Sequence, residues 1–145
     1  MAHAEGKITI DRPVQQVFDF ILDGANNPLW RASVMDIKPL TEKPYGVGSA
    51  FKQGLKSPSG RIDGDYQITE CQPNQVIKFQ VTAGPARPTG SYIFESDGKS
   101  TTLTFILDFQ PKGLAKLMTS MIQSSMQSEV ATLSTLKTYL ESHTQ

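Results

Sequence analysis

The last third of the sequence is predicted to form one long helix with an apolar face, from about Pro111 to Glu141. A helix of about 30 residues would be roughly 45 Å long, which is more than most globular partner elements need. At least five short strand-like runs precede it. We therefore expect the helix to lie across a curved sheet and close it, and the space left by that closure is where function is to be sought.

The composition fits one domain without a strong electrostatic field. The chain has 145 residues, close to the commonest domain size, and its 14 Lys and Arg balance its 14 Asp and Glu. A net charge of zero gives no global attraction to nucleic acid or to an anionic membrane surface. No run approaches the roughly 18 apolar residues of a membrane span. We expect a single domain over residues 1–145, no nucleic-acid partner and no stable membrane insertion.

The N-terminal segment and the cysteine content indicate the compartment. The segment MAHAEGKITI lacks the basic start and apolar stretch of a secretory signal, and Cys71 is the single cysteine. An internal disulfide framework is therefore excluded, and a cytoplasmic protein is the default expectation. The sequence leaves the oligomeric state open between monomer and homodimer.

The N-terminal part of the chain alternates between short strands and short helices. Lys7 to Asp11 alternates as a strand, and Val34 to Leu40 reads as a second one. A helix is predicted over Pro13 to Leu22, with a helical turn over Asn26 to Trp30 after a break at Gly24. The apolar stripe of the first helix consists of Val14, Val17, Phe18, Ile21 and Leu22.

A meander of strands follows, with one apolar and one polar face. The strands are expected near residues 49–55, 61–71, 75–82, 90–96 and 101–109. Asp97-Gly98 is the clearest hairpin turn among the breaks. Alternation places these residues on the apolar face: Phe51, Ile62, Tyr66, Ile68, Ile77, Phe79, Val81, Tyr92, Phe94, Leu103, Phe105, Leu107 and Phe109. Such a sheet must cover its apolar face, and only the helices can do so.

The C-terminal helix has two chemically different halves. Its inward stripe consists of Met118, Ile122, Met126, Glu129, Leu133, Leu136 and Leu140, widened by Leu114, Leu117 and Met121. Leucines in the second half suggest fixed packing. Methionines in the first half suit a variable ligand surface, although methionine also fills irregular cores without any ligand.

Glu129 is the one charge on that stripe. An unpaired buried carboxylate is costly, so Glu129 should either find a partner or shift its pKa. It is a candidate polar anchor or general base, or else it lies at the boundary in water. Gln53 and Tyr66 share the inward register of the sheet and could orient a polar group of a ligand, while a tyrosine in a core often just bonds to backbone.

Several other residues have two interpretations. Trp30 either packs or stacks against a ligand at one flank of a cavity. Arg31, Arg61 and Arg87 could meet an anionic head group at a mouth, or be ordinary solvated arginines. The loops at 54–61 and 83–90 are the candidate gates, because their Gly and Pro residues leave few packed contacts.

Counting residues excludes several catalytic arrangements. The only histidines, His3 and His143, lie in expected frayed ends, so neither a Ser-His-Asp triad nor a histidine-bound metal is expected. Cys71 is placed on the strand face opposite Tyr66. No nucleotide-binding glycine motif is present in its required context. We therefore expect neither a cofactor nor a metal.

The element order as a whole resembles the helix-grip fold of the SRPBCC superfamily, which includes START-like, birch-pollen-allergen-like and polyketide cyclase/dehydrase proteins. The segments that carry the resemblance are IDRPVQQVFDFILD (Ile10 to Asp23), NNPLW (Asn26 to Trp30), GVGSAF (Gly46 to Phe51) and LSTLKTYLES (Leu133 to Ser142). The resemblance implies an α+β fold, with a curved antiparallel sheet of about seven strands wrapped on the C-terminal helix and two short helices between strands 1 and 2. It also implies a deep, mostly apolar cavity for lipids, sterols, polyketides or similar molecules. Most members share no catalytic residues, so none is carried over.

We favour the binding of a hydrophobic small molecule, such as a lipid, a polyketide or an aromatic-like compound. The candidate ligand-binding residues are Trp30, Phe51, Gln53, Tyr66, Phe79, Tyr92, Met118, Met121, Ile122 and Met126. One alternative is a cyclase-, dehydratase- or isomerase-type enzyme that uses the same cavity, with Glu129 and Tyr66 as candidate catalytic residues. Another is a module that binds a protein partner through an exposed apolar face.

Overall fold

The structure is a computed structural model that describes residues 2–143, except for the side chains at positions 114 and 115. The strands are β1 (Ala2–Ile10), β2 (Val34–Pro39), β3 (Ala50–Ser57), β4 (Gly60–Asp63), β5 (Tyr66–Gln72), β6 (Val76–Val81), β7 (Thr89–Ser96) and β8 (Thr101–Phe109). The α-helices are α1 (Val14–Leu22), α2 (Thr119–Val130) and α3 (Leu133–Ser142), and the 3₁₀ helices are η1 (Gly24–Leu29) and η2 (Gly113–Met118). Leu114, expected on the inward stripe, lies outside the described side chains.

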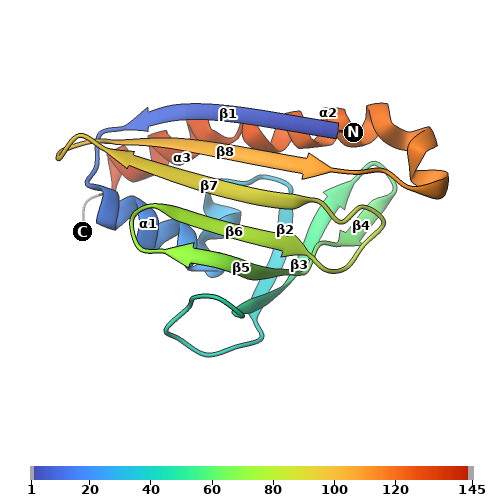
Figure 1. The fold of residues 1–145 in the computed structure, drawn as a ribbon, viewed down its shortest axis with the longest axis horizontal. Helices are drawn as coiled ribbons and strands as arrows, with labels where there is room; N and C mark the ends of the chain where they lie inside the picture. Colours follow the sequence, from blue (N-terminus) through green and yellow to red (C-terminus); the bar gives the residue numbers. More distant parts are fainter. Residues whose placement is uncertain (1, 144–145) are drawn as a thin grey trace.

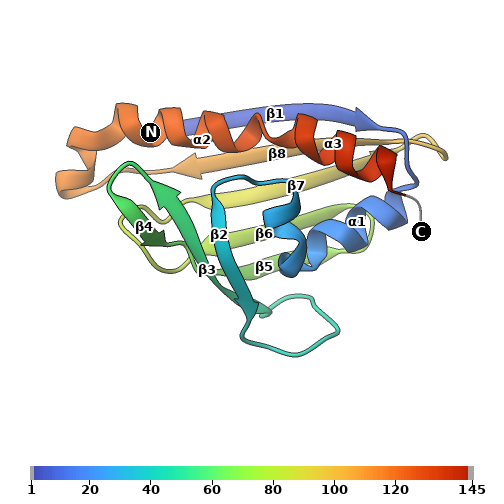
Figure 2. The same cartoon turned by 180° about the vertical axis from the view of Figure 1, so that it is seen from behind.

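All strands belong to one antiparallel sheet whose apolar face is covered by helices. Seven strands follow the order β1-β8-β7-β6-β5-β3-β2, and β4 pairs with β3 beside them (Figure 1). The opposite view shows α2 and α3 running along β1 and β8, while α1 lies over β5 and β6 (Figure 2). The predicted helix-grip architecture is confirmed, including the two short helices between the first two strands.

One predicted strand is divided into two. The sequence pattern predicts a single strand over 61–71, whereas β4 ends at Asp63 and β5 begins at Tyr66. Both strands pair with β3, because Leu55 lies opposite Ile62 and Phe51 lies opposite Tyr66. The intervening bend adds the small strand β4 to the seven of the main path, and it folds the β3–β4 hairpin over one end of the sheet.

The first strand is longer than predicted. The sequence pattern places a strand from Lys7, but β1 begins at Ala2, so His3 is a strand residue and not part of a frayed end. Small residues alternate along its inner face, where Ala2 and Ala4 are buried. They let the C-terminal helices approach closely: a Cβ at Gly6 would lie 3.1 Å from the carbonyl oxygen of Val130. Small side chains carry little strand propensity, which is why the pattern understates this strand.

Five aromatic rings on the inner face form one continuous row across the sheet. They are Phe51, Tyr66, Phe79, Tyr92 and Phe105, from β3, β5, β6, β7 and β8, with successive ring centroids 5.2, 5.4, 5.7 and 4.6 Å apart. Neighbouring aromatic pairs at such distances each add about 0.5–1.5 kcal/mol beyond the burial of their area. The indole of Trp30 lies edge-on to Tyr92 and Phe105, and its side chain is fully enclosed. We name these five rings the aromatic row.

The C-terminal helix is interrupted, in contrast to the single helix predicted from Pro111 to Glu141. The segment begins with the 3₁₀ helix η2, and Ala131 and Thr132 separate α2 from α3. The Thr132 hydroxyl donates to the carbonyl oxygen of Glu129 at 2.5 Å, a local side-chain bond of the kind that bends helices. The tighter winding of η2 also explains why Leu117, predicted to face inward, is 85 % exposed.

A β-bulge changes which face Cys71 occupies. The register of β5 against β6 shifts between Ile68 and Glu70, so Cys71 pairs with the buried Ile77 and packs against the core. The prediction that Cys71 faces away from Tyr66 and Ile68 is therefore wrong. An inserted residue reverses the alternation that the prediction followed.

Two leucines of the C-terminal segment give a matched test of this packing. Leu136 is fully buried, so Leu136→Ala should lower the free energy of unfolding by about 2–5 kcal/mol. Leu117→Ala removes the same atoms from an exposed site and should change it by less than about 0.5 kcal/mol. Chemical denaturation of both variants measures the difference, and equal effects would contradict the helix placement.

Candidate functional site

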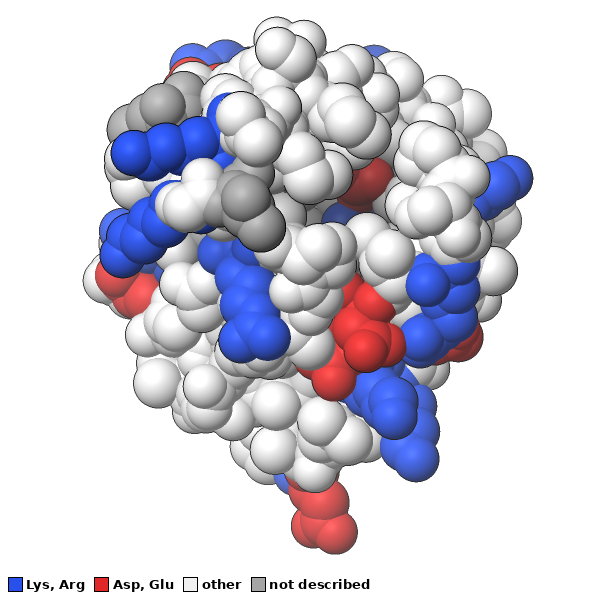
Figure 3. All heavy atoms as spheres, turned by 90° about the vertical axis from the view of Figure 1, so that its right-hand side faces the viewer, with Lys and Arg blue, Asp and Glu red and all other residues white. Residues whose placement is uncertain are grey.

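A cavity of about 310 Å³ lies between the sheet, the β3–β4 hairpin and the first half of α2. Its volume is at the lower end of the range of about 300–1,000 Å³ that is typical of small-molecule sites. Figure 3 faces the end of the molecule at which η2 and the β3–β4 hairpin lie, and it shows a hollow with charged atoms of both signs at its bottom. We name this space the outer cavity.

The walls of the outer cavity are mainly apolar. The helix contributes Met118, Met121, Ile122, Ser125 and Met126, and the sheet contributes Leu55, Ile62, Val81 and Leu107. The hairpin adds residues 56–59 and 63–64, and the loop before β7 adds Pro85, Ala86 and Pro88. Both loops predicted as gates therefore line the cavity. Met118 and Met121 are also 45 % and 59 % exposed, so the methionines extend from the wall to the rim.

The inner end of the outer cavity is polar and consists of Arg31, Ser33 and Glu129, which we name the polar floor. The Nε and Nη2 atoms of Arg31 lie 2.8 and 2.6 Å from Oε1 of Glu129. The Ser33 hydroxyl donates to Oε2 of the same carboxylate at 2.5 Å. The chain from η1 to β2 supplies two of these residues, and the last turn of α2 supplies the third. The polar floor thus ties both ends of the fold together.

The polar floor is a buried ion pair. The side chains of Arg31 and Glu129 are only 9 % and 18 % exposed. Burial by itself would lower the pKa of Arg31, but the Glu129 carboxylate, together with the nearby Tyr92 and Tyr66, more than offsets this, and the pKa of Arg31 lies above its ordinary value. Arg31 is therefore a charged, buried residue and not the solvated arginine of one sequence interpretation. Glu129, the one charge on the apolar stripe, is therefore paired with Arg31.

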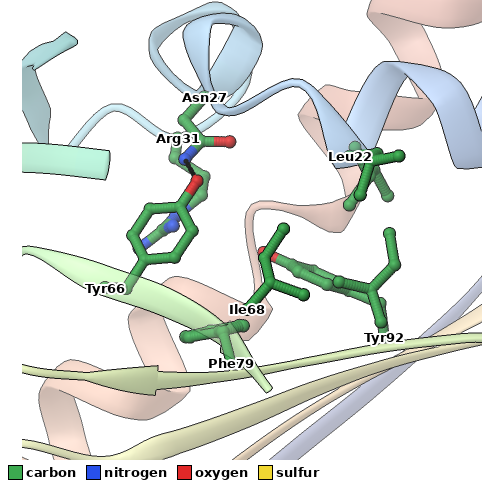
Figure 4. A pocket seen from close by; sticks show the side chains of 9 residues that line it. Leu22, Asn27, Arg31, Tyr66, Ile68, Phe79 and Tyr92 are labelled. Carbon is green, nitrogen blue, oxygen red and sulfur yellow. Dashed lines mark hydrogen bonds between the residues drawn. The ribbon is translucent and has the colours of Figure 1, made fainter. Parts of the chain in front are cut away.

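Behind the polar floor lies a second, nearly closed space between α1, η1 and the sheet (Figure 4). Its volume of about 10 Å³ is room for about one water molecule at most. The lining residues are Ile21, Leu22, Asn27, Arg31, Tyr66, Ile68, Ile77, Phe79 and Tyr92. Arg31 lines both spaces, so its side chain separates the inner void from the outer cavity.

Asn27 organises the polar groups around the inner void. Its Nδ2 donates to Oε1 of Gln53 at 3.0 Å and to the hydroxyl of Tyr66 at 3.1 Å. The Gln53 amide in turn donates to the carbonyl oxygen of Gly64 at 3.3 Å. Burial raises the pKa of Tyr66 well above its ordinary value, so the phenol is neutral at physiological pH. These groups satisfy one another within the protein.

The structure sorts the predicted ligand-binding residues into two sets. Gln53, Met118, Met121, Ile122 and Met126 line the outer cavity together with Glu129. Tyr66, Phe79 and Tyr92 line the inner void, and Trp30 and Phe51 lie in the core with the aromatic row. Alternation alone cannot separate the sets, because all the sheet residues among them face inward.

The two other candidate arginines, Arg61 and Arg87, lie outside both spaces, and so does the discounted His3. Arg61 is held by Asp36 and Asp63, with each nitrogen–oxygen distance 2.9 Å. Arg87 is exposed in the loop before β7, where its Nε donates to the carbonyl oxygen of Gly84. His3 contacts Asp108 at 2.5 Å on the outside of β1. Within residues 2–143, no cluster of three potential metal ligands occurs.

Sequence reasoning missed Ser33 and Asn27. Both are small polar residues in the segment between α1 and β2, Asn27 within η1 and Ser33 after it, where such residues usually cap or turn the chain. Their closeness to Trp30 in the sequence could have indicated that they face the interior, because this segment crosses the apolar face of the sheet. Neither the partner of Ser33 nor that of Asn27 can be read from local sequence.

The similarity of the sequence to known protein families identifies the family of this chain. The family described as polyketide cyclase / dehydrase and lipid transport matches residues 1–141, and the chain belongs to it. The predicted SRPBCC assignment is thereby confirmed. No curated protein matches the chain.

Solved structures show the same fold at low sequence identity. TTHA0849 from Thermus thermophilus is 15 % identical with a TM-score of 0.81, over 99 % of this chain and 99 % of that one. The ZhuI aromatase/cyclase from a Streptomyces species is 15 % identical with a TM-score of 0.75, over 96 % and 93 %. A START superfamily protein from Mycobacterium smegmatis is 8 % identical with a TM-score of 0.75, over 99 % and 100 %.

Within the described part of the chain, no helix is long and apolar enough to cross a membrane.

The buried phenol of Tyr92 predicts a stability loss at alkaline pH. Burial raises the pKa of Tyr92 to about 12 from an ordinary value of 10.0. The unfolded chain then releases this proton first, so the contribution to stability is complete below about pH 10 and falls by about 2–3 kcal/mol as the pH rises to about 12. Denaturation across this range should show a smaller decline for Tyr92→Phe than for the wild type. Parallel declines would contradict the assignment.

Proposed function

We propose that the protein binds a hydrophobic small molecule in the outer cavity. The observation that carries this proposal is a space of about 310 Å³ whose walls are mainly apolar and whose inner end is polar and built by Arg31, Ser33 and Glu129. Small-molecule sites typically combine an apolar wall with a few placed polar groups. Membership of a family described by polyketide cyclisation and lipid transport supports the same class of ligand.

The methionine-rich wall supports a site that adapts to its ligand. Met118, Met121 and Met126 are unbranched, and their thioethers pack against varied shapes. The exposed methionines at the rim also give an apolar molecule a path between solvent and the cavity. Residues 56–59 and the loop before β7 form the opposite side of that path and act as the gates in this proposal.

A cyclase- or dehydratase-type enzyme is the second candidate. The observation that favours it is a carboxylate, Glu129, held at the end of an apolar cavity by fixed donors. The binding function is preferred because the two candidate catalytic groups do not share one space: Glu129 lines the outer cavity, while the Tyr66 hydroxyl is bonded to Asn27 beside the inner void. Acid–base catalysis needs its groups within hydrogen-bond reach of one substrate.

Filling the cavity tests the binding function. Ser125 lines the outer cavity, so Ser125→Trp should place an indole in the ligand space. We expect the affinity for the neutral fluorescent probe N-phenylnaphthylamine, measured by fluorescence titration, to fall at least about tenfold, or about 1.4 kcal/mol. The matched control is Ser124→Trp, an exposed neighbour on α2 that does not line the cavity. Equal binding by both variants, or no binding by the wild type, would contradict the proposal.

A further inference from the structure

The charges of the polar floor indicate which end group a ligand can carry. This inference rests on the proposed function. Four charged residues line the outer cavity, namely Arg31, Lys56, Asp63 and Glu129. Lys56 is exposed, and Asp63, at 56 % side-chain exposure, is paired with Arg61. Arg31 is buried and Glu129 is largely buried, so these two dominate the electrostatics at the inner end of the cavity.

The two buried charges cancel across the floor. Both Arg31 nitrogens that face the carboxylate lie within 2.8 Å of the same oxygen of Glu129. An anionic head group that approached Arg31 would also meet the negative Glu129, and it would lose its hydration on entering. Burying an extra charge beside a pair that is already neutral is costly. The floor is therefore a poor site for a carboxylate or phosphate.

The same floor is not suited to a purely apolar end group. A hydrocarbon end would displace water from an ion pair without replacing any of its hydrogen bonds, and unpaired buried polar groups are costly. The floor has unused bonding capacity: Oε2 of Glu129 accepts from Ser33, and a carboxylate oxygen can accept a second bond. Two N–H groups of Arg31 face Glu129 and another lies against the Tyr92 hydroxyl, so part of the five-donor capacity of the guanidinium remains for a ligand.

We propose that the outer cavity selects an apolar molecule with one neutral end group that both donates and accepts a hydrogen bond, such as an alcohol or a phenol. The hydroxyl donates to Oε2 of Glu129 and accepts from the Arg31 guanidinium, while the apolar body lies against Ile122 and Met126. The cavity volume of about 310 Å³ is at the lower end of the range for small-molecule sites, so the ligand is the size of a bicyclic aromatic or a short chain.

Three probes with the same ring system test this selection on the wild-type protein. Naphthol, naphthoate and naphthalene share one ring system and differ only in the end group. We expect naphthol to bind at least about tenfold more tightly than either of the others in isothermal titration calorimetry at neutral pH, because two added hydrogen bonds are together worth roughly that factor. Preferential binding of naphthoate, or equal binding of naphthalene, would overturn the inference.

Removing the negative charge of the floor should reverse the preference. Glu129→Gln keeps an acceptor for Ser33 but leaves the Arg31 charge uncompensated, so the affinity for naphthoate relative to naphthol should rise about tenfold or more. Asp36→Asn is the matched control: Asp36 is also paired with an arginine, Arg61, but it is exposed and lies outside the cavity lining. An unchanged ratio in Glu129→Gln would overturn the inference.

The probes also separate this inference from the proposed function. If N-phenylnaphthylamine binds and is lost in Ser125→Trp, while naphthol shows no preference, the cavity binds ligands and only the end-group selection is overturned. If neither N-phenylnaphthylamine nor any naphthalene derivative binds, both proposals fall. The binding of naphthol, naphthoate and naphthalene to the wild-type protein tests the end-group selection even if Glu129→Gln does not fold.

Discussion

The buried pair between Arg31 and Glu129 is the interaction on which the arrangement of this protein depends. The two residues are far apart in the sequence, yet their atoms lie 2.6 Å apart and join the segment after η1 to the end of α2. Two buried charges tolerate little displacement, because each one alone would be strongly destabilising. The pair therefore holds the last turn of α2 against the segment after η1, at the inner end of the outer cavity.

The division of the interior follows from the same constraint. On one side of Arg31, the aromatic row and Trp30 pack with only a void of about 10 Å³ beside them. On the other side, flexible methionines and two loops surround about 310 Å³. Close packing of aromatic rings gives the fold its stability, while the end of the sheet near the β3–β4 hairpin is free to hold a ligand. One residue thus marks the boundary between structural core and candidate binding site.

The sequence was sufficient for the helix-grip architecture and for part of the lining of the candidate site. Strand alternation identified the inward residues, and the stripe of α2 identified Met118, Ile122 and Met126 on the cavity wall. The sequence pattern could not distinguish these cavity residues from core residues such as Tyr92 and Phe51, because both kinds face the inside of the sheet. Nor could it pair Arg31 with Glu129 across most of the chain, or foresee the bulge that turned Cys71 inward. These features depend on tertiary contacts that leave no local periodicity.

Methionine methyl NMR tests the central claim, ligand binding in the outer cavity, most directly. Met118, Met121 and Met126 line the cavity, whereas Met35 is exposed on β2 and serves as an internal control. When naphthol is titrated into the methyl-labelled protein, the account predicts shifts of the three cavity resonances along one saturable curve, with the Met35 resonance unchanged. Saturable shifts of Met35 alone, or of none of these methyl groups, would contradict a ligand site between α2 and the sheet.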